Sequence, residues 1–187
     1  MGHDPGLPSN PSPLFWALLV LTLLTAFGSL FLTLGMQLVA CTLCFYQRTF
    51  ILGLSAILIV GVSLGLHRQG TLSMLALPLV SAGLCVAVFH HWLEYRRVLE
   101  CPAGLFGLGT APMQSVVCFG LLTLGFAVDV LLGARSSDLA ATVTLALGLG
   151  LAAGVLSIIS GPKLEIPKQP YDKPLNGCRP RYFPPPQ

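Results

Sequence analysis

The stretch Leu14–Leu34, LFWALLVLTLLTAFGSLFLTL, decides the class of this protein. It contains no charged residue, and it is long enough to cross a bilayer as a helix, which takes about 20 apolar residues. Similar apolar stretches follow at residues 45–66, 71–89, 113–132 and 139–159. We therefore predict an all-α membrane protein that folds as a helical bundle of five transmembrane helices.

The composition of the chain supports the same class. Of its 187 residues, 54% are hydrophobic and 9% are charged, whereas a soluble domain carries about 25% charged residues. So few charges cannot cover a surface that faces water, and we expect membrane lipid around the bundle. The net charge of +3 is small, and no dense basic block predicts a nucleic-acid partner.

Polar segments divide the chain into three regions. We predict a cytoplasmic N-terminal segment at residues 1–13, the membrane bundle at 14–160 and a periplasmic tail at 161–187. Prolines are dense in the tail and resist both helix and sheet, so we expect it to be extended and mobile. The segment Tyr95–Pro112 is predicted to be a loop outside the membrane.

Two cysteines lie at the start of the second apolar stretch, in Cys41-Thr42-Leu43-Cys44-Phe45-Tyr46-Gln47-Arg48. This C-x-x-C spacing lets two thiols join in a small ring or act as nucleophile and resolver. A thiolate is the attacking species, and its pKa falls beside a cation or at a helix N-terminus. Arg48 follows Cys44 by one helical turn, where it can stabilise a Cys44 thiolate or an anionic partner. The pattern predicts thiol–disulfide chemistry that passes electrons into the lipid phase. A structural disulfide, half of a metal site and interfacial snorkelling of Arg48 are the alternatives.

The number of spans predicts which cysteines share one side of the membrane. The cysteines placed together by five spans are Cys41, Cys44, Cys101 and Cys178. Cys85 and Cys118 fall within spans, where we expect them to be apolar packing residues. Because disulfides persist on the oxidising side, we predict that the shared face is periplasmic.

The distribution of cations favours the opposite orientation, since short cytoplasmic segments are normally rich in Lys and Arg. The cations on the predicted outer side are Arg96, Arg97, Lys163, Lys168, Lys173, Arg179 and Arg181. Those on the predicted inner side are Arg68 and Arg135. We keep the periplasmic assignment because a disulfide pair has little use in a reducing cytosol.

These residues resemble a known family of membrane proteins, the disulfide bond formation protein B (DsbB) family. The resemblance lies in Cys41-x-x-Cys44 followed by Gln47-Arg48, and in residues 111–115, APMQS, before the fourth span. It covers roughly Leu14–Leu132 and implies a four-helix core, to which this chain adds a fifth, C-terminal span. The related vitamin K epoxide reductase family has its C-x-x-C late in the bundle, so the order here favours DsbB.

The resemblance implies an enzyme, a protein-dithiol:quinone oxidoreductase of the bacterial inner membrane. Family members reoxidise DsbA, a thioredoxin-fold protein, and pass two electrons to a quinone of the respiratory pool, ubiquinone or menaquinone. The implied catalytic residues are Cys41, Cys44 and Cys101, to which a hypothesis given below adds Cys178. The expected quinone-binding residues are Arg48, Gln47, His91 and His90. No metal is expected at this site.

Two of these assignments leave alternatives open. Family members place a histidine near the quinone, and the sequence does not choose between His90 and His91; an interfacial histidine without a role is the other reading. Glu94, one turn beyond His90, is a candidate to orient it or a solvated rim charge.

The second redox pair is a further hypothesis from the resemblance. Family members carry two cysteines in the loop between the third and fourth spans, but this loop has only Cys101. We hypothesise that Cys178 supplies the missing partner, because the chain from Ser160 to Cys178 reaches tens of ångströms when extended. A Cys101–Cys118 pair and a free Cys178 thiol are the rivals.

Other classes of protein remain as alternatives. A metal-binding protein would use Cys41, Cys44, His90 and His91 as ligands, although Arg48 nearby opposes a cation. A disulfide-stapled subunit of a larger membrane complex and a vitamin K epoxide reductase-like enzyme are the others.

Overall fold

The computed structural model describes residues 12–66, 71–133, 139–162, 167, 169–172 and 174–183. Residues 1–11 of the predicted N-terminal segment lie outside these ranges. So do five cations used in the orientation argument: Arg68, Arg135, Lys163, Lys168 and Lys173.

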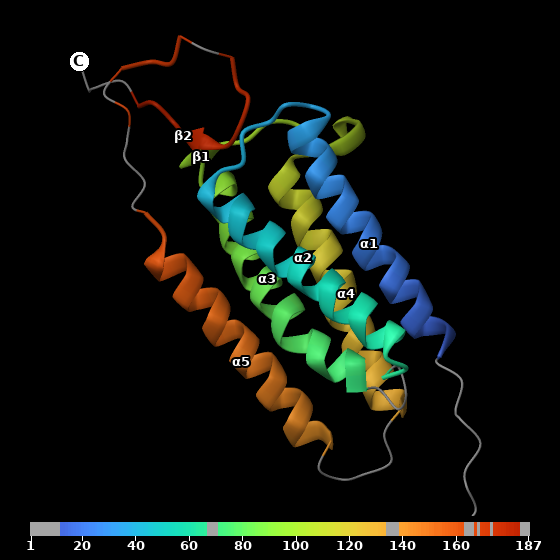
Figure 1. Ribbon diagram of the computed structural model, residues 1–187. Coiled ribbons are helices and arrows are strands. Elements are labelled where there is room, and N and C mark those ends of the chain that lie inside the picture. The colour runs from blue at the N-terminus through green and yellow to red at the C-terminus, as the bar shows by residue number, and fades with distance from the viewer. Residues whose placement is uncertain are drawn as a thin grey trace, which may run out of the picture.

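Five long helices build the described part of the chain (Figure 1). They are α1 (Pro13–Leu34), α2 (Thr42–Ser63), α3 (Thr71–Tyr95), α4 (Ala111–Gly133) and α5 (Leu139–Ser160). Each is long and apolar enough to cross a membrane, which confirms the predicted five-helix membrane bundle.

Two helix boundaries differ from the sequence prediction in ways that matter for function. Helix α2 begins at Thr42, before the predicted Phe45, so Cys41 is its N-cap and Cys44 lies in its first turn. The side-chain sulfur of Cys41 satisfies a backbone N–H of that turn, which allows the earlier start. Helix α3 continues past the predicted end at Phe89 as far as Tyr95, so its two histidines lie within the helix.

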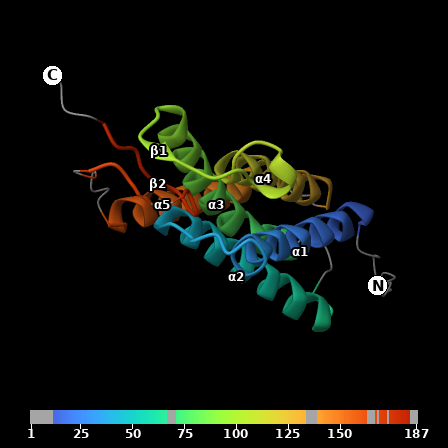
Figure 2. The ribbon, with the colours of Figure 1, turned by 90° about the horizontal axis from the view of Figure 1, so that it is seen from above.

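Helix α3 is the centre of the bundle. Its most apolar window is 56% buried, against 22–28% in the other four spans. Helices α1 to α4 form the main bundle, and α5 packs on the outside of α3 (Figure 2). The residues that fill the core with no exposed surface include Leu54, Leu58, Leu77, Val80, Leu122 and Phe126. Large apolar side chains also cover the outer faces of the helices, as lipid requires.

Two glycines allow α5 to approach α3 closely. A Cβ at Gly150 would overlap the carbonyl oxygen of Pro78 and the hydroxyl of Ser81. A Cβ at Gly154, one turn later, would overlap Cys85. This G-x-x-x-G spacing is typical of close helix contacts in membranes. Gly148, on the same helix, has open space where its Cβ would be, so it is not used for this packing.

A buried carboxylate connects three helices at the end of the bundle opposite the cysteines. Asp129 of α4 accepts hydrogen bonds from the hydroxyls of Ser12, the N-cap of α1, and Ser73, in the first turn of α3. A negative charge is favourable at helix N-termini, and the two hydroxyls satisfy it inside an apolar bundle.

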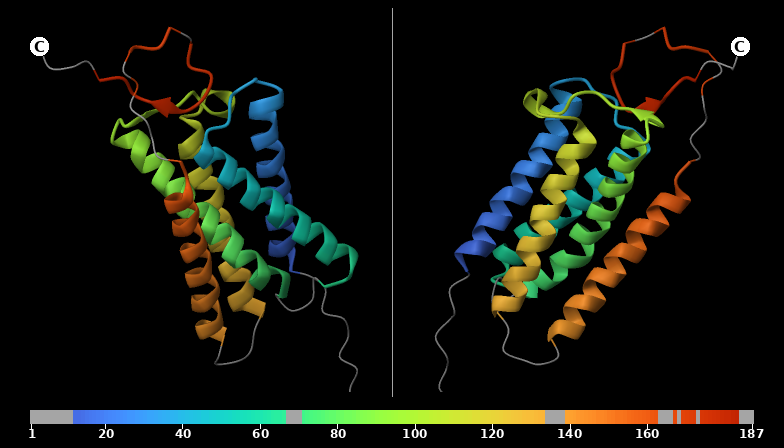
Figure 3. Two further views of the ribbon diagram at one scale, coloured as in Figure 1. Left: turned by 60° about the vertical axis from the view of Figure 1, so that its left-hand side comes forward. Right: turned by 180° about the vertical axis from the view of Figure 1, so that it is seen from behind.

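The loops and the tail gather at one end of the bundle (Figure 3). The loop after α3 contains strand β1 (Leu99–Glu100) and the short 3-10 helix η1 (Leu105–Gly107). In the tail, strand β2 (Arg179–Pro180) pairs antiparallel with β1. The prediction that tail prolines resist sheet is wrong for this segment, because Pro180 pairs with Leu99 at the end of a two-residue strand, where one missing N–H costs little.

Candidate active site

The C-x-x-C pair is shaped by the first turn of α2. Cys41 Sγ accepts a hydrogen bond from the backbone N–H of Cys44 at 3.3 Å, and the two sulfurs lie 3.0 Å apart without a bond. The hydrogen bond from the Cys44 thiol lowers the pKa of Cys41 to about 4, assisted by His90 and opposed by burial. Cys41 is therefore a thiolate at neutral pH whenever this pair is reduced.

The second pair is a disulfide between the loop and the tail. Cys101 and Cys178 are bonded across 77 residues of sequence, directly beside the β1–β2 ladder. The hypothesised pairing is thus the one found in the structure. Cys118 is a free cysteine on α4, so the rival Cys101–Cys118 pair and the free Cys178 thiol are both wrong.

Backbone contacts hold the tail in place on both sides of Cys178. The Val39 N–H donates to the carbonyl of Asn176 at 2.7 Å, and Arg181 N–H donates to Val98 at 2.9 Å. Gly177 forms a bridge with Val39, and a Cβ at Gly177 would overlap the Val39 carbonyl. A glycine at this position lets the tail lie against the 35–41 loop.

Two ion pairs add to this attachment. Glu100 on β1 lies 3.8 Å from Arg179, in β2, and 3.4 Å from Arg181, directly after β2. These side chains are partly exposed, so the pairs contribute a small amount, at most about 1 kcal/mol each. The tail near Cys178 is therefore an ordered part of the site.

His90 lies between the two redox pairs. Its side chain has no exposed surface. Nε2 is 3.7 Å from Cys41 Sγ and 3.6 Å from Cys101 Sγ. The Gln47 side-chain amide donates to His90 Nδ1 at 3.3 Å. In neutral His90 this bond places the ring proton on Nε2, directed at the sulfurs.

His91 points to a different set of groups. Its Nδ1 lies 3.2 Å from Glu94 Oε2, which also accepts a hydrogen bond from Thr110 at 2.8 Å. Of the two roles considered for Glu94, the structure thus excludes the one of orienting His90. Both i+3 and i+4 spacings can bring side chains together on a helix, but the His90 ring is turned towards Gln47 and Cys41. Neither histidine is among the described residues that line the cavity beside Cys44.

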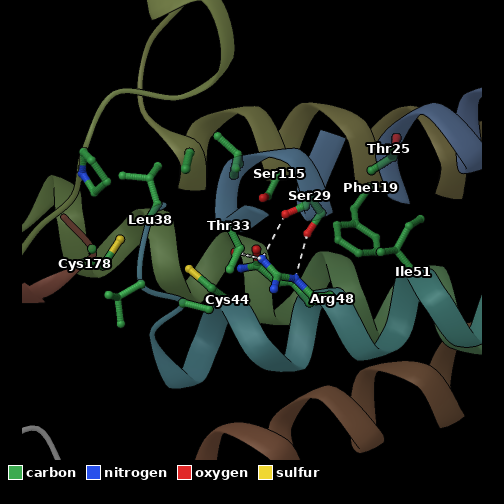
Figure 4. Close-up of a pocket in the computed structure, with 17 residues that line it drawn as sticks. Thr25, Ser29, Thr33, Leu38, Cys44, Arg48, Ile51, Ser115, Phe119 and Cys178 are labelled. Carbon is green, nitrogen blue, oxygen red and sulfur yellow. Dashed lines mark hydrogen bonds between the residues drawn. The ribbon is translucent and has the colours of Figure 1, made fainter. Parts of the chain in front are cut away.

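A cavity opens beside Cys44, between α1, α2, the start of α4 and the tail (Figure 4). Its polar lining includes Cys44, Gln47, Arg48, Ser115 and Cys178. The apolar lining includes Leu32, Leu38, Ile51 and Phe119. One cavity is thus lined by a cysteine of each redox pair and an arginine, with apolar walls of the kind that are common in small-molecule sites.

Arg48 is oriented by α1, which the sequence analysis did not anticipate. Its Nη2 donates to Thr33 Oγ1 at 2.6 Å and to the Ser29 carbonyl at 2.9 Å, and its Nε donates to Ser29 Oγ at 3.2 Å (Figure 4). Among the described residues these bonds use Nε and Nη2, which leaves Nη1 as a donor for a ligand. Ser29 and Thr33 are spaced i and i+4 in an uncharged span, a pattern that could have indicated a helix face with a polar partner.

Three cysteine sulfurs and a histidine ring nitrogen lie close together at this end of the bundle. The Sγ atoms of Cys41, Cys44 and Cys178 and a ring nitrogen of His90 all lie within 4.8 Å of one another. Thiol–disulfide exchange requires one sulfur to reach another through a mixed disulfide, and this cluster provides that proximity. The fold and the site therefore define a multi-pass membrane protein equipped for disulfide exchange.

Comparison with known proteins gives the family. The model of the family described as "Disulfide bond formation protein DsbB" matches residues 11–118, more than half of the chain, and the chain belongs to this family. Its role is in disulfide-bond formation. The matched segment contains Cys41, Cys44, His90 and Cys101 and ends before α5.

Curated relatives agree with this assignment. The "SPbeta prophage-derived disulfide bond formation protein B" of Bacillus subtilis is 30% identical over 119 residues, which are 56% of this chain and 78% of the relative. The "Probable disulfide formation protein C" of Bacillus cereus is 27% identical over 112 residues, with the same shares. The "Probable disulfide formation protein" of Metapseudomonas resinovorans is 27% identical over 140 residues, 65% of this chain and 94% of the relative. No solved structure matches the chain.

Proposed function

We propose that this protein is a protein-dithiol:quinone oxidoreductase that reoxidises a DsbA-like thioredoxin-fold protein and passes the electrons to ubiquinone or menaquinone. One observation carries the proposal: Cys44 lies within 4.8 Å of Cys41 and Cys178 and also lines a cavity with Arg48. The same sulfur thus contacts the exchange cluster and an apolar ligand site.

Electrons enter at the loop–tail disulfide. A thiolate of the partner attacks Cys101, forms a mixed disulfide and releases Cys178 as a thiolate. Cys178 attacks Cys41 of an oxidised Cys41–Cys44 pair, and Cys44 leaves as the thiolate. The second partner thiolate then attacks the mixed disulfide, which releases oxidised partner and the Cys101 thiolate. Cys101 attacks Cys178, restores the loop–tail disulfide and leaves Cys41 as a thiolate. The order of attack follows the family.

His90 is proposed to stabilise the thiolates that form in each of the two redox pairs. Its Nε2–H is directed at Cys41 and Cys101, which lie 3.7 and 3.6 Å away. A hydrogen bond to a thiolate stabilises it, so His90 favours whichever of these sulfurs leaves or attacks. His91 is bound to Glu94 at the rim, and we assign it no contact with the quinone.

The cavity beside Cys44 is the proposed quinone site. A quinone accepts two electrons and two protons when it is reduced to the quinol. The Nη1 group of Arg48 would donate to a quinone oxygen that gains negative charge, while Ser29 and Thr33 hold the guanidinium still. Ile51 and Phe119 supply apolar surface, and Gln47 lines the same wall. A bound quinone would accept the electron pair through Cys44, at the edge of the cavity, as Cys41 attacks the Cys44 sulfur and re-forms the disulfide. The two protons given up by the partner thiols would complete the quinol.

We place the protein in the bacterial inner membrane with its cysteines in the periplasm. The tail and the loops that carry Cys41 and Cys101 lie at one end of the bundle, so one compartment must accept all three. An oxidising compartment preserves the Cys101–Cys178 bond. Two of the cations that count against this orientation, Arg179 and Arg181, pair with Glu100 and help to hold the tail at this end. Residues 1–13 are then cytoplasmic and 161–187 periplasmic.

The proposal is tested by turnover of the purified full chain in detergent or nanodiscs. Reduced DsbA-type protein and a soluble quinone are mixed with catalytic amounts of enzyme, and quinol formation and partner thiols are followed together. We expect one quinol per partner disulfide, abolished by Cys44→Ser and unchanged by Cys118→Ser. Oxidation of quinol with reduction of the partner as the favoured direction would support a vitamin K epoxide reductase-like enzyme, and absence of turnover would contradict the proposal.

A further inference from the structure

The cluster of sulfurs around His90 has the dimensions of a metal site. In a tetrahedral zinc site with Zn–S near 2.3 Å and Zn–N near 2.0 Å, a ligand sulfur and a ligand nitrogen lie roughly 3.5 Å apart. His90 Nε2 is 3.7 Å from Cys41 Sγ. The ligand atoms of Cys41, Cys44, Cys178 and His90 all lie within 4.8 Å of one another. Two sulfurs of such a site lie roughly 3.8 Å apart. The Cys41 and Cys44 sulfurs are 3.0 Å apart, so a three-sulfur, one-nitrogen shell needs shifts of about 1 Å from these distances.

We propose that the reduced form of this site binds one zinc-class divalent cation through Cys41, Cys44, Cys178 and His90. The C-x-x-C spacing and a histidine on a neighbouring helix are a common ligand set for structural zinc. The site forms only when both disulfides are reduced, because Cys178 is bonded to Cys101 in the oxidised pair. A phosphine or dithiol reductant supplies the four electrons that open the two disulfides, and the cation displaces the thiol protons that remain, while Cys101 is left as a free thiol.

Arg48 carries a positive charge near this site, which would oppose a bound cation, but its contacts direct the guanidinium elsewhere. Its guanidinium is bound to Ser29 and Thr33 on α1, and it lines the cavity beside Cys44. Cys41 and His90 are not among the described residues of that cavity, so two of the four ligands lie outside the space that Arg48 lines. Three thiolates also bring three negative charges, which outweigh one nearby cation.

Gln47 determines which nitrogen of His90 is available. As placed, the amide of Gln47 donates to Nδ1, which puts the proton on Nε2, where a metal would bind. Rotating the amide by half a turn presents its oxygen to an Nδ1–H and frees the Nε2 lone pair. An acceptor at this position is the usual partner of a metal-bound histidine. Gln47→Glu would provide that acceptor permanently.

Metal binding is measured with cobalt on the full chain in detergent, reduced by a phosphine and freed of excess reductant. We expect one Co²⁺ per chain, with thiolate-to-cobalt charge-transfer bands, and displacement by Zn²⁺. Loss of a group that only hydrogen-bonds to a metal ligand costs about 10–100-fold in metal affinity. Loss of a ligand itself, in Cys178→Ser or His90→Asn, should therefore weaken binding at least about 100-fold. Gln47→Glu should tighten it about tenfold or more, and Cys118→Ser should leave it unchanged.

The second part of the test compares metal binding by the oxidised protein and by the reduced protein. Protein with both disulfides formed should bind no cobalt, and Zn²⁺ should inhibit the reduced protein reversibly, with activity restored by a chelator. Only the inhibition rests on the proposed function, since binding is scored without quinone. Absence of cobalt bands in reduced protein, equal binding by oxidised protein, or an unchanged affinity in both His90→Asn and Gln47→Glu would overturn the inference. Turnover in chelator without metal binding would overturn it and leave the proposed function intact.

Discussion

The two redox pairs are held in opposite ways. Cys41 and Cys44 lie at the start of one helix, where the cap and first turn bring their sulfurs to 3.0 Å. Cys101 and Cys178 are separated by 77 residues, and a two-residue strand pair, a backbone bridge and two ion pairs bring them together. The first pair is local and preorganised, whereas the second is assembled from a loop and a tail. In the proposed function the loop–tail pair reacts with the protein partner. The pair on α2 is held in place beside the cavity.

The largest effect is expected when turnover of a protein partner is compared with turnover of a small dithiol, because only the protein partner needs the Cys101–Cys178 pair. Cys178→Ser removes the assembled pair, so we expect oxidation of a protein partner to fall at least about a thousandfold, as for loss of a catalytic nucleophile. A small dithiol can reduce Cys41–Cys44 directly, and its turnover should survive in this variant. Cys44→Ser should abolish both reactions. Equal loss of both reactions in Cys178→Ser would show that the two pairs are not separable.

Arg48→Met should affect the local pair and its cavity alone. A hydrogen bond to a charged group contributes about 1.5–3 kcal/mol, so we expect quinone reduction to slow by about 10- to 100-fold with both protein and small dithiols. Arg96→Met, which removes an exposed cation near Trp92, is the matched control. Steady-state rates as a function of quinone concentration measure the effect, and a loss confined to the protein substrate would contradict this role.

The pH dependence of alkylation should identify Cys41 as the charged sulfur. Its pKa of about 4 lies below the ordinary thiol value near 8.5, so alkylation of reduced protein should persist at pH 6 and fall only near pH 4. The same depressed pKa stabilises the reduced fold above about pH 8.5, and this contribution is lost as the pH falls through 4. Alkylation rates read by mass spectrometry test the expectation, and His90→Asn should shift the midpoint upward.

Packing of α5 should matter for the assembled pair and not for the local one. Gly154→Leu would collide with Cys85, and overpacking of this kind costs about 1–3 kcal/mol. We expect the yield of the Cys101–Cys178 bond and the rate with a protein partner to fall several-fold, with small-dithiol turnover unchanged. Gly148→Leu, on the same helix with open space around it, is the matched control. Non-reducing mass spectrometry of the two variants decides the outcome.

The smallest effect is expected at Glu100. Glu100→Gln removes the ion pairs with Arg179 and Arg181, which are worth at most about 1 kcal/mol each at this exposure. We expect at most a few-fold lower rate with a protein partner, more pronounced at low salt. Asp172→Asn, an exposed change elsewhere in the tail, should have no effect. A loss as large as that of Cys178→Ser would mean that the ion pairs, and not the ladder, hold the tail.

The parts predictable from the sequence are those set by local pattern. Five apolar stretches give five helices, and C-x-x-C followed by Arg48 indicates the redox pair because spacing on one helix is a local property. The choice between His90 and His91 was not predictable, since it depends on how α3 is rotated against α2. The β1–β2 ladder was hidden by the prolines, because two residues of strand are decided by their partner and not by propensity.

The position of Cys178 after α5 has a consequence for biosynthesis. Cys41, Cys44, His90 and Cys101 leave the ribosome early, while the last member of the cluster follows only after α5 and the glycines that seat it on α3. A chain of which only four helices have been made lacks both the Cys178 sulfur of the loop–tail disulfide and the tail residues that line the cavity beside Cys44. The Cys101–Cys178 bond can therefore form only after α5 has been made, so the complete sulfur cluster is a property of the finished chain.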